Sequence, residues 1–199
     1  MKKIETVWHE ILYQALQNKI YKHTQQDLAK KFSYSLGTIH HALKIPTQIG
    51  AIRKESKFFV LQDFGKLLYY WASLRNFKKD ITYQTYFEGT ATQIEGLATP
   101  SSIYAGYSAG RKILQEPPTD YERVYFYVNQ KNLDEFKQRF PLSKAAKANI
   151  FALKMPPPME QYGLVATLPQ TFVDIWNLED WYSRDFTKAL EEKINGLLS

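Results

Sequence analysis

The amino-acid sequence predicts an α+β protein made of two domains. Apolar residues recur at helical spacing through much of the first 48 residues, which indicates a largely helical N-terminal part. In the second half, apolar segments at 122–128 and 148–155 are separated by helical patterns and indicate a sheet. The charge is divided too: residues 1–80 hold 14 Lys/Arg and 6 Asp/Glu, a net of +8, whereas residues 81–199 hold 12 and 14, a net of −2. We therefore expect one basic domain at 1–80 and a mixed α/β domain at 81–199.

Composition excludes several classes of protein. The chain has 199 residues, of which 44% are hydrophobic and 15% aromatic, so it can bury a core and is not a disordered chain. No apolar run approaches the length of a bilayer span, so we expect no membrane segment. The first ten residues carry charges where a secretory signal would be apolar, and we expect a cytoplasmic protein. Without cysteine, disulfides, cysteine nucleophiles and thiolate metal sites are excluded.

Residues 1–80 predict three helices, a strand hairpin and a linking helix at 63–76. The first helix has a single apolar stripe of Ile4, Val7, Trp8, Ile11, Leu12 and Leu16. Thr24, Ser35 and Asp63 are suited to cap the second, third and linking helices. Residues 52–61 read as a strand, a polar turn and a second strand. This order of elements is that of a winged helix-turn-helix.

The third helix contains two adjacent histidines, which raise the question of a metal site. At 100° per residue, its buried face is predicted to consist of Leu36, Ile39, Ala42 and Leu43. The opposite face carries Gly37, His41 and Lys44, with Thr38 at its edge and His40 on the flank. Because His40 and His41 diverge by one 100° step, they cannot bind one metal ion from the same turn. We expect neither histidine to be a metal ligand.

A polar, cationic helix face followed by a basic hairpin predicts binding to double-stranded DNA. In a winged helix, the third helix enters the major groove and the wing lies along phosphates. His41 and Thr38 are then candidates for base contacts, and Gly37 permits close approach. The cationic side chains that would contact phosphates are Lys44, Arg53, Lys54 and Lys57. Pro46 is expected to shorten the helix to about two and a half turns.

Two other interpretations stay open. One is a winged helix that contacts only protein. The other is a nucleotidyltransferase, because the second half could form a degenerate nucleotidyltransferase-like sheet, with Gly106 and Ser108 for the phosphates and Asp120 and Glu122 for metal ions. However, the positions inside the strand that follows are Arg123 and Tyr125, which do not ligate magnesium. No histidine follows His41, which excludes a Ser-His-Asp site confined to this half.

The second half predicts a mixed sheet with helices packed on it. Strands are expected at 81–87, 122–128, 148–155 and 163–167, and helices at 100–114, 133–140, 169–178 and from 179 to the end. Asn132 is expected to cap the second of these helices, and Trp176 and Trp181 to pack the last two.

Longer motifs give the chain a family resemblance. The segment TQQDLAKKFSYSLGTIHHALKIPTQIGAI resembles the winged-helix domain of prokaryotic transcriptional regulators. The whole chain resembles regulators grouped with the type IV abortive-infection antitoxins (AbiEi-like), through LLYYWASLRNFKKDITYQTYF, YAGYSAGRKI before YERVYFYV, and TFVDIWNLEDWYSRDF. Pro46 departs from the usual long recognition helix of such regulators.

The resemblance implies a sequence-specific DNA-binding regulator that represses its own promoter. It further implies that antitoxin members neutralise a nucleotidyltransferase-like toxin, and it allows a homodimer. For DNA contact it supports Ser35, Thr38, His41 and Lys44. It assigns no catalytic residue, so we expect no enzyme, no metal and no cofactor.

Overall fold

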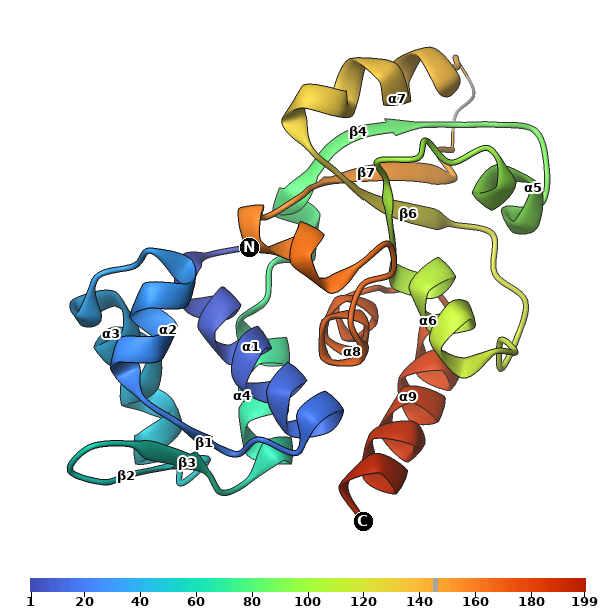
Figure 1. The fold of residues 1–199 in the computed structure, drawn as a ribbon. Coiled ribbons are helices and arrows are strands. Elements are labelled where there is room, and N and C mark those ends of the chain that lie inside the picture. Colours follow the sequence, from blue (N-terminus) through green and yellow to red (C-terminus); the bar gives the residue numbers. More distant parts are fainter. Residues whose placement is uncertain (145–146) are drawn as a thin grey trace. The chain divides into compact units, whose positions relative to one another are not determined.

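The computed structural model describes residues 1–144 and 147–199 and shows an α+β protein with two separate sheets (Figure 1). The chain forms two compact units. One consists of Met1–Arg75 with Gly196–Ser199, and the other of Asn76–Asn195. Along the described residues, none of the helices combines the length and apolar character needed to cross a bilayer.

The first unit is mainly helical and has a small antiparallel sheet. In residues 1–75 its elements are α1 (Lys3–Asn18), β1 (Lys22–His23), α2 (Gln25–Phe32), α3 (Leu36–Gln48), β2 (Ile52–Lys54), β3 (Phe59–Leu61) and α4 (Phe64–Leu74). The strand order is β1-β3-β2, so the short strand before α2 joins the outer side of the β2–β3 hairpin. Figure 1 shows α2 and α3 on the same side of α1, and the hairpin leading from α3 to α4.

Three helices of this unit begin where the sequence predicted. The Thr24 hydroxyl accepts a hydrogen bond from the backbone N–H three residues on, at 3.0 Å. Ser35 and Asp63 do the same for α3 and α4, at 3.1 and 2.9 Å. Each side chain satisfies one of the N–H groups that a helix start leaves without a partner. The predicted caps are therefore confirmed.

Helix α3 does not stop at Pro46, which corrects the expectation of a short third helix. The helix runs from Leu36 to Gln48, with a buried Pro46 near its end. Proline has no N–H, so the carbonyl of Ala42, four residues earlier, loses its usual donor. The indole Nε1 of Trp8, on α1, donates to that carbonyl at 2.7 Å. A tryptophan from another helix thus replaces the hydrogen bond that proline cannot make.

A buried carboxylate joins α1 to α4. Glu5 is only 4% exposed. Its Oε2 accepts a hydrogen bond from Trp71 Nε1 at 3.1 Å and lies 3.7 Å from Arg75 Nη1. Its Oε1 accepts from the backbone N–H of Lys2 at 2.9 Å. Because a buried charge is tolerated only when it is paired, these partners fix the position of α4 against α1.

The second unit contains a mixed four-stranded sheet in its described part. Its elements are η1 (Phe77–Asp80), β4 (Ile81–Thr85), α5 (Ala91–Gly96), β5 (Ile103–Ala105), α6 (Gly106–Leu114), β6 (Val124–Val128), η2 (Gln130–Asn132), α7 (Leu133–Arg139), β7 (Ile150–Lys154), η3 (Pro157–Tyr162), α8 (Leu168–Trp176) and α9 (Ser183–Leu198) up to Asn195. The strand order is β4-β7-β6-β5, with β6 and β7 parallel and the other pairs antiparallel. The predicted mixed sheet is confirmed.

Helices cover both faces of this sheet. All five residues of β6 are buried, because alternate side chains enter different cores. On one face, Phe126 packs against Phe136 of α7, with ring centroids 5.7 Å apart. On the other face, the hydroxyl of Tyr127 donates to the buried carboxylate of Asp174 on α8, at 2.5 Å. The strand predicted at 122–128 is therefore confirmed, as the buried central strand β6.

The single helix expected at 100–114 is wrong in its first part. Residues Ile103–Ala105 form β5, which pairs with β6, and the helix begins only at Gly106. Gly106 has a φ of 51°, and a Cβ added there would lie 2.9 Å from the Tyr125 ring. Glycine is needed here because the chain turns from strand to helix against an aromatic ring.

Three smaller expectations in this half are also corrected. The side chain of Asn132 makes no capping hydrogen bond to α7. The strand expected at 163–167 is reduced to one bridge between Tyr104 and Val165. Trp181 is 75% exposed, so it does not pack the last two helices together, and Trp176 stacks on Phe172 while remaining 48% exposed.

Candidate nucleic-acid interface

The outer face of α3 is exposed and polar. Its inner side chains, Ile39, Ala42 and Leu43, have no exposed surface. On the outer side Gly37, His40, His41 and Lys44 are exposed, and Thr38 is half-buried. The helix therefore presents its histidines and lysine to solvent while its apolar stripe anchors it.

Leu36 departs from the predicted arrangement. The helical wheel placed it on the buried face, yet it is 52% exposed. It is the first residue of α3, and the contacts that bury the stripe begin one turn later, at Ile39. Leu36 lines an open trough of about 520 Å³ whose other walls come from α2 and the hairpin, through Thr24, Gln25, Gln26, Glu55, Ser56, Lys57 and Phe58.

The polar groups in the first turn of α3 bind one another. The hydroxyl oxygens of Ser35 and Thr38 lie 3.0 Å apart in a hydrogen bond, and the Ser35 oxygen also accepts from the Thr38 backbone N–H. The Ser35 hydroxyl is therefore engaged in capping α3, which limits its use in contacts with another molecule. They also hold the Thr38 side chain in place.

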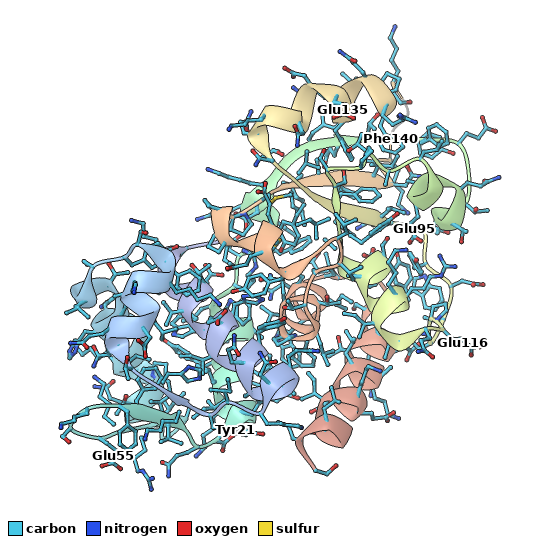
Figure 2. All side chains as sticks on the ribbon, viewed as in Figure 1. Tyr21, Glu55, Glu95, Glu116, Glu135 and Phe140 are labelled. Carbon is cyan, nitrogen blue, oxygen red and sulfur yellow. The ribbon has the colours of Figure 1, made fainter. Side chains whose placement is uncertain are left out.

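The β2–β3 hairpin carries the other predicted cations. A hydrogen bond from the backbone N–H of Glu55 to the carbonyl of Phe58, at 2.8 Å, closes its turn. Figure 2 shows Glu55 at the end of the hairpin, where its carboxylate pairs with Arg53 Nε at 3.0 Å. Lys54 is partly buried and Lys57 is exposed. Of these cations, Arg53 therefore has an acidic neighbour that reduces its positive field.

Sequence reasoning missed a further cation beside the hairpin. Lys22, in β1, is exposed, and its Nζ lies 4.0 Å from the centroid of the Phe58 ring. Only the pairing of β1 with β3 brings Lys22 here, so no local pattern could have indicated it. The neighbouring His23 adds no charge near neutral pH, because burial lowers the pKa of its imidazole.

Helices α2 and α3 are fixed to the rest of the first unit. Lys31 of α2 forms an ion pair with Glu10 of α1 at 2.5 Å, and the glutamate is 3% exposed. Helix α3 is held by the Trp8–Ala42 hydrogen bond and by its buried stripe. A rigid support of this kind suits a surface that must match a fixed ligand shape.

The residues of the nucleotidyltransferase interpretation are only partly brought together. Asp120 and Glu122 are exposed, precede β6 rather than lying in it, and line a cavity of about 630 Å³ in the second unit. Ser108 is fully buried in α6 and does not line this cavity. Sequence order alone could not show that the serine points into the core.

The arginines of this cavity already have acidic partners. Arg111 pairs with the buried Glu95 at 2.7 Å, which raises the pKa of the guanidinium, and Arg123 pairs with Asp180 at 3.0 Å. Among the residues the structure describes, no three His, Asp or Glu side chains are grouped to hold a metal ion.

The comparisons with known proteins give no relatives. Neither family models, nor curated proteins, nor solved structures match this chain.

Proposed function

We propose that the protein is a sequence-specific DNA-binding transcriptional regulator whose first unit is a winged helix-turn-helix. The observation that carries this proposal is the exposed, polar and cationic outer face of α3 next to a basic hairpin. In the winged helix-turn-helix mode, α3 enters the major groove and the hairpin follows the adjacent phosphates.

The residues divide by role in this proposal. His41 and Thr38 read base edges, and Gly37 lets the helix approach them closely. Lys44, Arg53, Lys54, Lys57 and the newly found Lys22 contact phosphates, which position the protein without reading sequence. Ser35 is the helix cap and adds a contact from its exposed side.

The family resemblance extends the proposal to the role of the protein in the cell. The regulator would repress its own promoter and act as an antitoxin against a nucleotidyltransferase-like toxin, as a monomer or a homodimer. The second unit would then carry the surface for the toxin or for dimerisation.

Fluorescence anisotropy with DNA from upstream of the protein's own gene tests the proposal. Wild type should prefer this duplex over an unrelated one and lose affinity steeply as salt rises. His41→Ala should lose the preference, and Lys44→Ala should weaken both duplexes and lower the salt slope by about one. Lys137→Ala, on α7 of the second unit, is the matched control. Equal binding to both duplexes by wild type would contradict sequence-specific regulation.

A metal-dependent nucleotidyltransferase is the second candidate, because Asp120 and Glu122 line one cavity of ligand size. Its test is magnesium-dependent transfer of labelled nucleotides to RNA or protein, with Asp120→Asn/Glu122→Gln as the inactive variant. Transfer that is lost in the double variant would favour this enzyme, and unchanged DNA binding by the same variant would favour the regulator.

A further inference from the structure

The exposed side chain of Leu36 stands at the position where a recognition helix reads bases. In helix-turn-helix complexes, the N-terminal residues of the recognition helix contact the base edges. Leu36 is the first residue of α3 and is 52% exposed. The position is accessible, because the side chain lines the open trough of about 520 Å³ between α2, α3 and the hairpin.

The other side chains of this first turn offer little polar readout. Ser35 and Thr38 share a hydrogen bond of 3.0 Å between their hydroxyls, and the serine also caps the helix. Gly37 has no side chain. Leu36 is thus the exposed side chain in this turn that is neither polar nor engaged in a capping hydrogen bond.

In the major groove, one base offers an apolar contact of its own. Thymine carries a C5-methyl group, whereas the other base edges present hydrogen-bond donors and acceptors. Burying a leucine against a donor or acceptor would leave that polar group without a partner, which costs free energy. A methyl group is therefore the feature of the groove that Leu36 suits.

Cations around the trough indicate that a DNA strand is the occupant. Lys57 lines the trough together with the acidic Glu55, which pairs with Arg53, and Lys22 lies against the ring of Phe58, another lining residue. Lys44 is exposed on the outer face of α3, two turns beyond Leu36 and about 80° around the helix from it. Positive side chains of this kind would contact the phosphates that flank a base in the groove.

We propose that Leu36 is a specificity-determining residue that contacts the C5-methyl group of a thymine in the operator. This inference rests on the proposed function and adds the chemical identity of one base. His40, one turn on and 40° further around the helix, would face the neighbouring base pair.

The test removes only the methyl group. The operator is first selected with the full-length protein from a randomised duplex pool, and each selected thymine is then replaced singly by deoxyuridine, which keeps the hydrogen-bonding edge. At one position the wild-type Kd should rise about three- to fivefold, the size expected for burying one methyl group. Leu36→Ala should bind the thymine duplex more weakly and show no further loss with deoxyuridine there. Leu36→Met, which keeps an apolar side chain, should retain much of the effect.

Ile45→Ala is the matched control, because Ile45 is a 37% exposed aliphatic residue near the other end of α3. It should keep the full deoxyuridine effect. If Leu36→Ala shows the same loss as wild type at every position, the inference is wrong although the protein still binds its operator. If wild type selects no sequence at all, the proposed function fails, and this inference fails with it.

Discussion

At the scale of single residues, His9 shows how strongly the core controls ionisation. His9 is 2% exposed, and its imidazole stacks on Tyr13 at 6.1 Å between ring centroids and meets Trp71 edge to face at 5.9 Å. Burial has the largest effect and lowers the pKa of the imidazole, Glu10 raises it, and Lys31 lowers it again. The resulting pKa is about 4. The imidazole is therefore neutral in the folded protein near neutral pH.

This pKa predicts that His9 makes the protein less stable in mild acid. Below about pH 6.5 the unfolded chain binds a proton at His9, whereas the folded chain does so only near pH 4. The free energy of unfolding that depends on keeping His9 neutral is thus fully present above about pH 6.5. It is lost as the pH falls to about 4, and the total loss is roughly 3 kcal/mol. Urea unfolding of wild type and His9→Phe at pH 7.5 and 4.5 measures it.

The variant should lose less stability between these two pH values than wild type. His40→Gln, a substitution at an exposed histidine, is the control. Identical pH dependence in wild type and His9→Phe would show that His9 titrates normally in the folded chain.

At the scale of elements, the sequence predicted the features that depend on residues close together in the chain. The caps at Thr24, Ser35 and Asp63 depend on a side chain and its own helix, and all three are confirmed. The continuation of α3 through Pro46 depends on Trp8, 34 residues away along the chain. No pattern around the proline could have indicated it.

The candidate site likewise has some features that local spacing predicts and others that depend on distant contacts. The outward position of His41 follows from helical spacing and is seen in the structure. The exposure of Leu36 could not be predicted, because a helical wheel gives the direction of a side chain around the helix but not where the core ends along the helix axis. The place of Lys22 depends on the pairing of β1 with β3, a long-range contact.

The Trp8–Ala42 hydrogen bond predicts a measurable coupling between α1 and α3. Trp8→Phe should leave the buried Ala42 carbonyl without a donor and cost about 1–3 kcal/mol of unfolding free energy for that group alone. In a Pro46→Ala background the new backbone N–H can bond to this carbonyl, so Trp8→Phe should cost less there. Urea unfolding of wild type, the two single variants and the double variant, as a double-mutant cycle, gives the difference.

Trp181→Phe is the control, because Trp181 is 75% exposed and should change stability little. Additive effects of Trp8→Phe and Pro46→Ala would mean that the indole does not replace the hydrogen bond that proline lacks.

At the scale of the whole molecule, the charge is distributed unevenly along the chain. Residues 1–80 have a net charge of +8 and residues 81–199 of −2, so the field that attracts a polyanion originates in the first part. Such a field acts over the Debye length, about 10 Å at 0.1 M and about 30 Å at 0.01 M salt. If the protein binds DNA as proposed, this field should speed association more than it slows dissociation.

This distribution predicts that removing one positive charge lowers the rate of association with DNA by an amount that depends on where the charge lies. Lys57→Gln on the hairpin should lower the association rate constant with operator DNA by roughly two- to fivefold at low salt, because the charge lies beside the proposed phosphate path. Lys137→Gln, the same change of charge on α7 of the second unit, should have a smaller effect. Stopped-flow fluorescence over a salt series measures both, and the difference between the variants should shrink as salt rises. Equal losses in the two variants would mean that net charge alone attracts DNA, with no directing role for the hairpin.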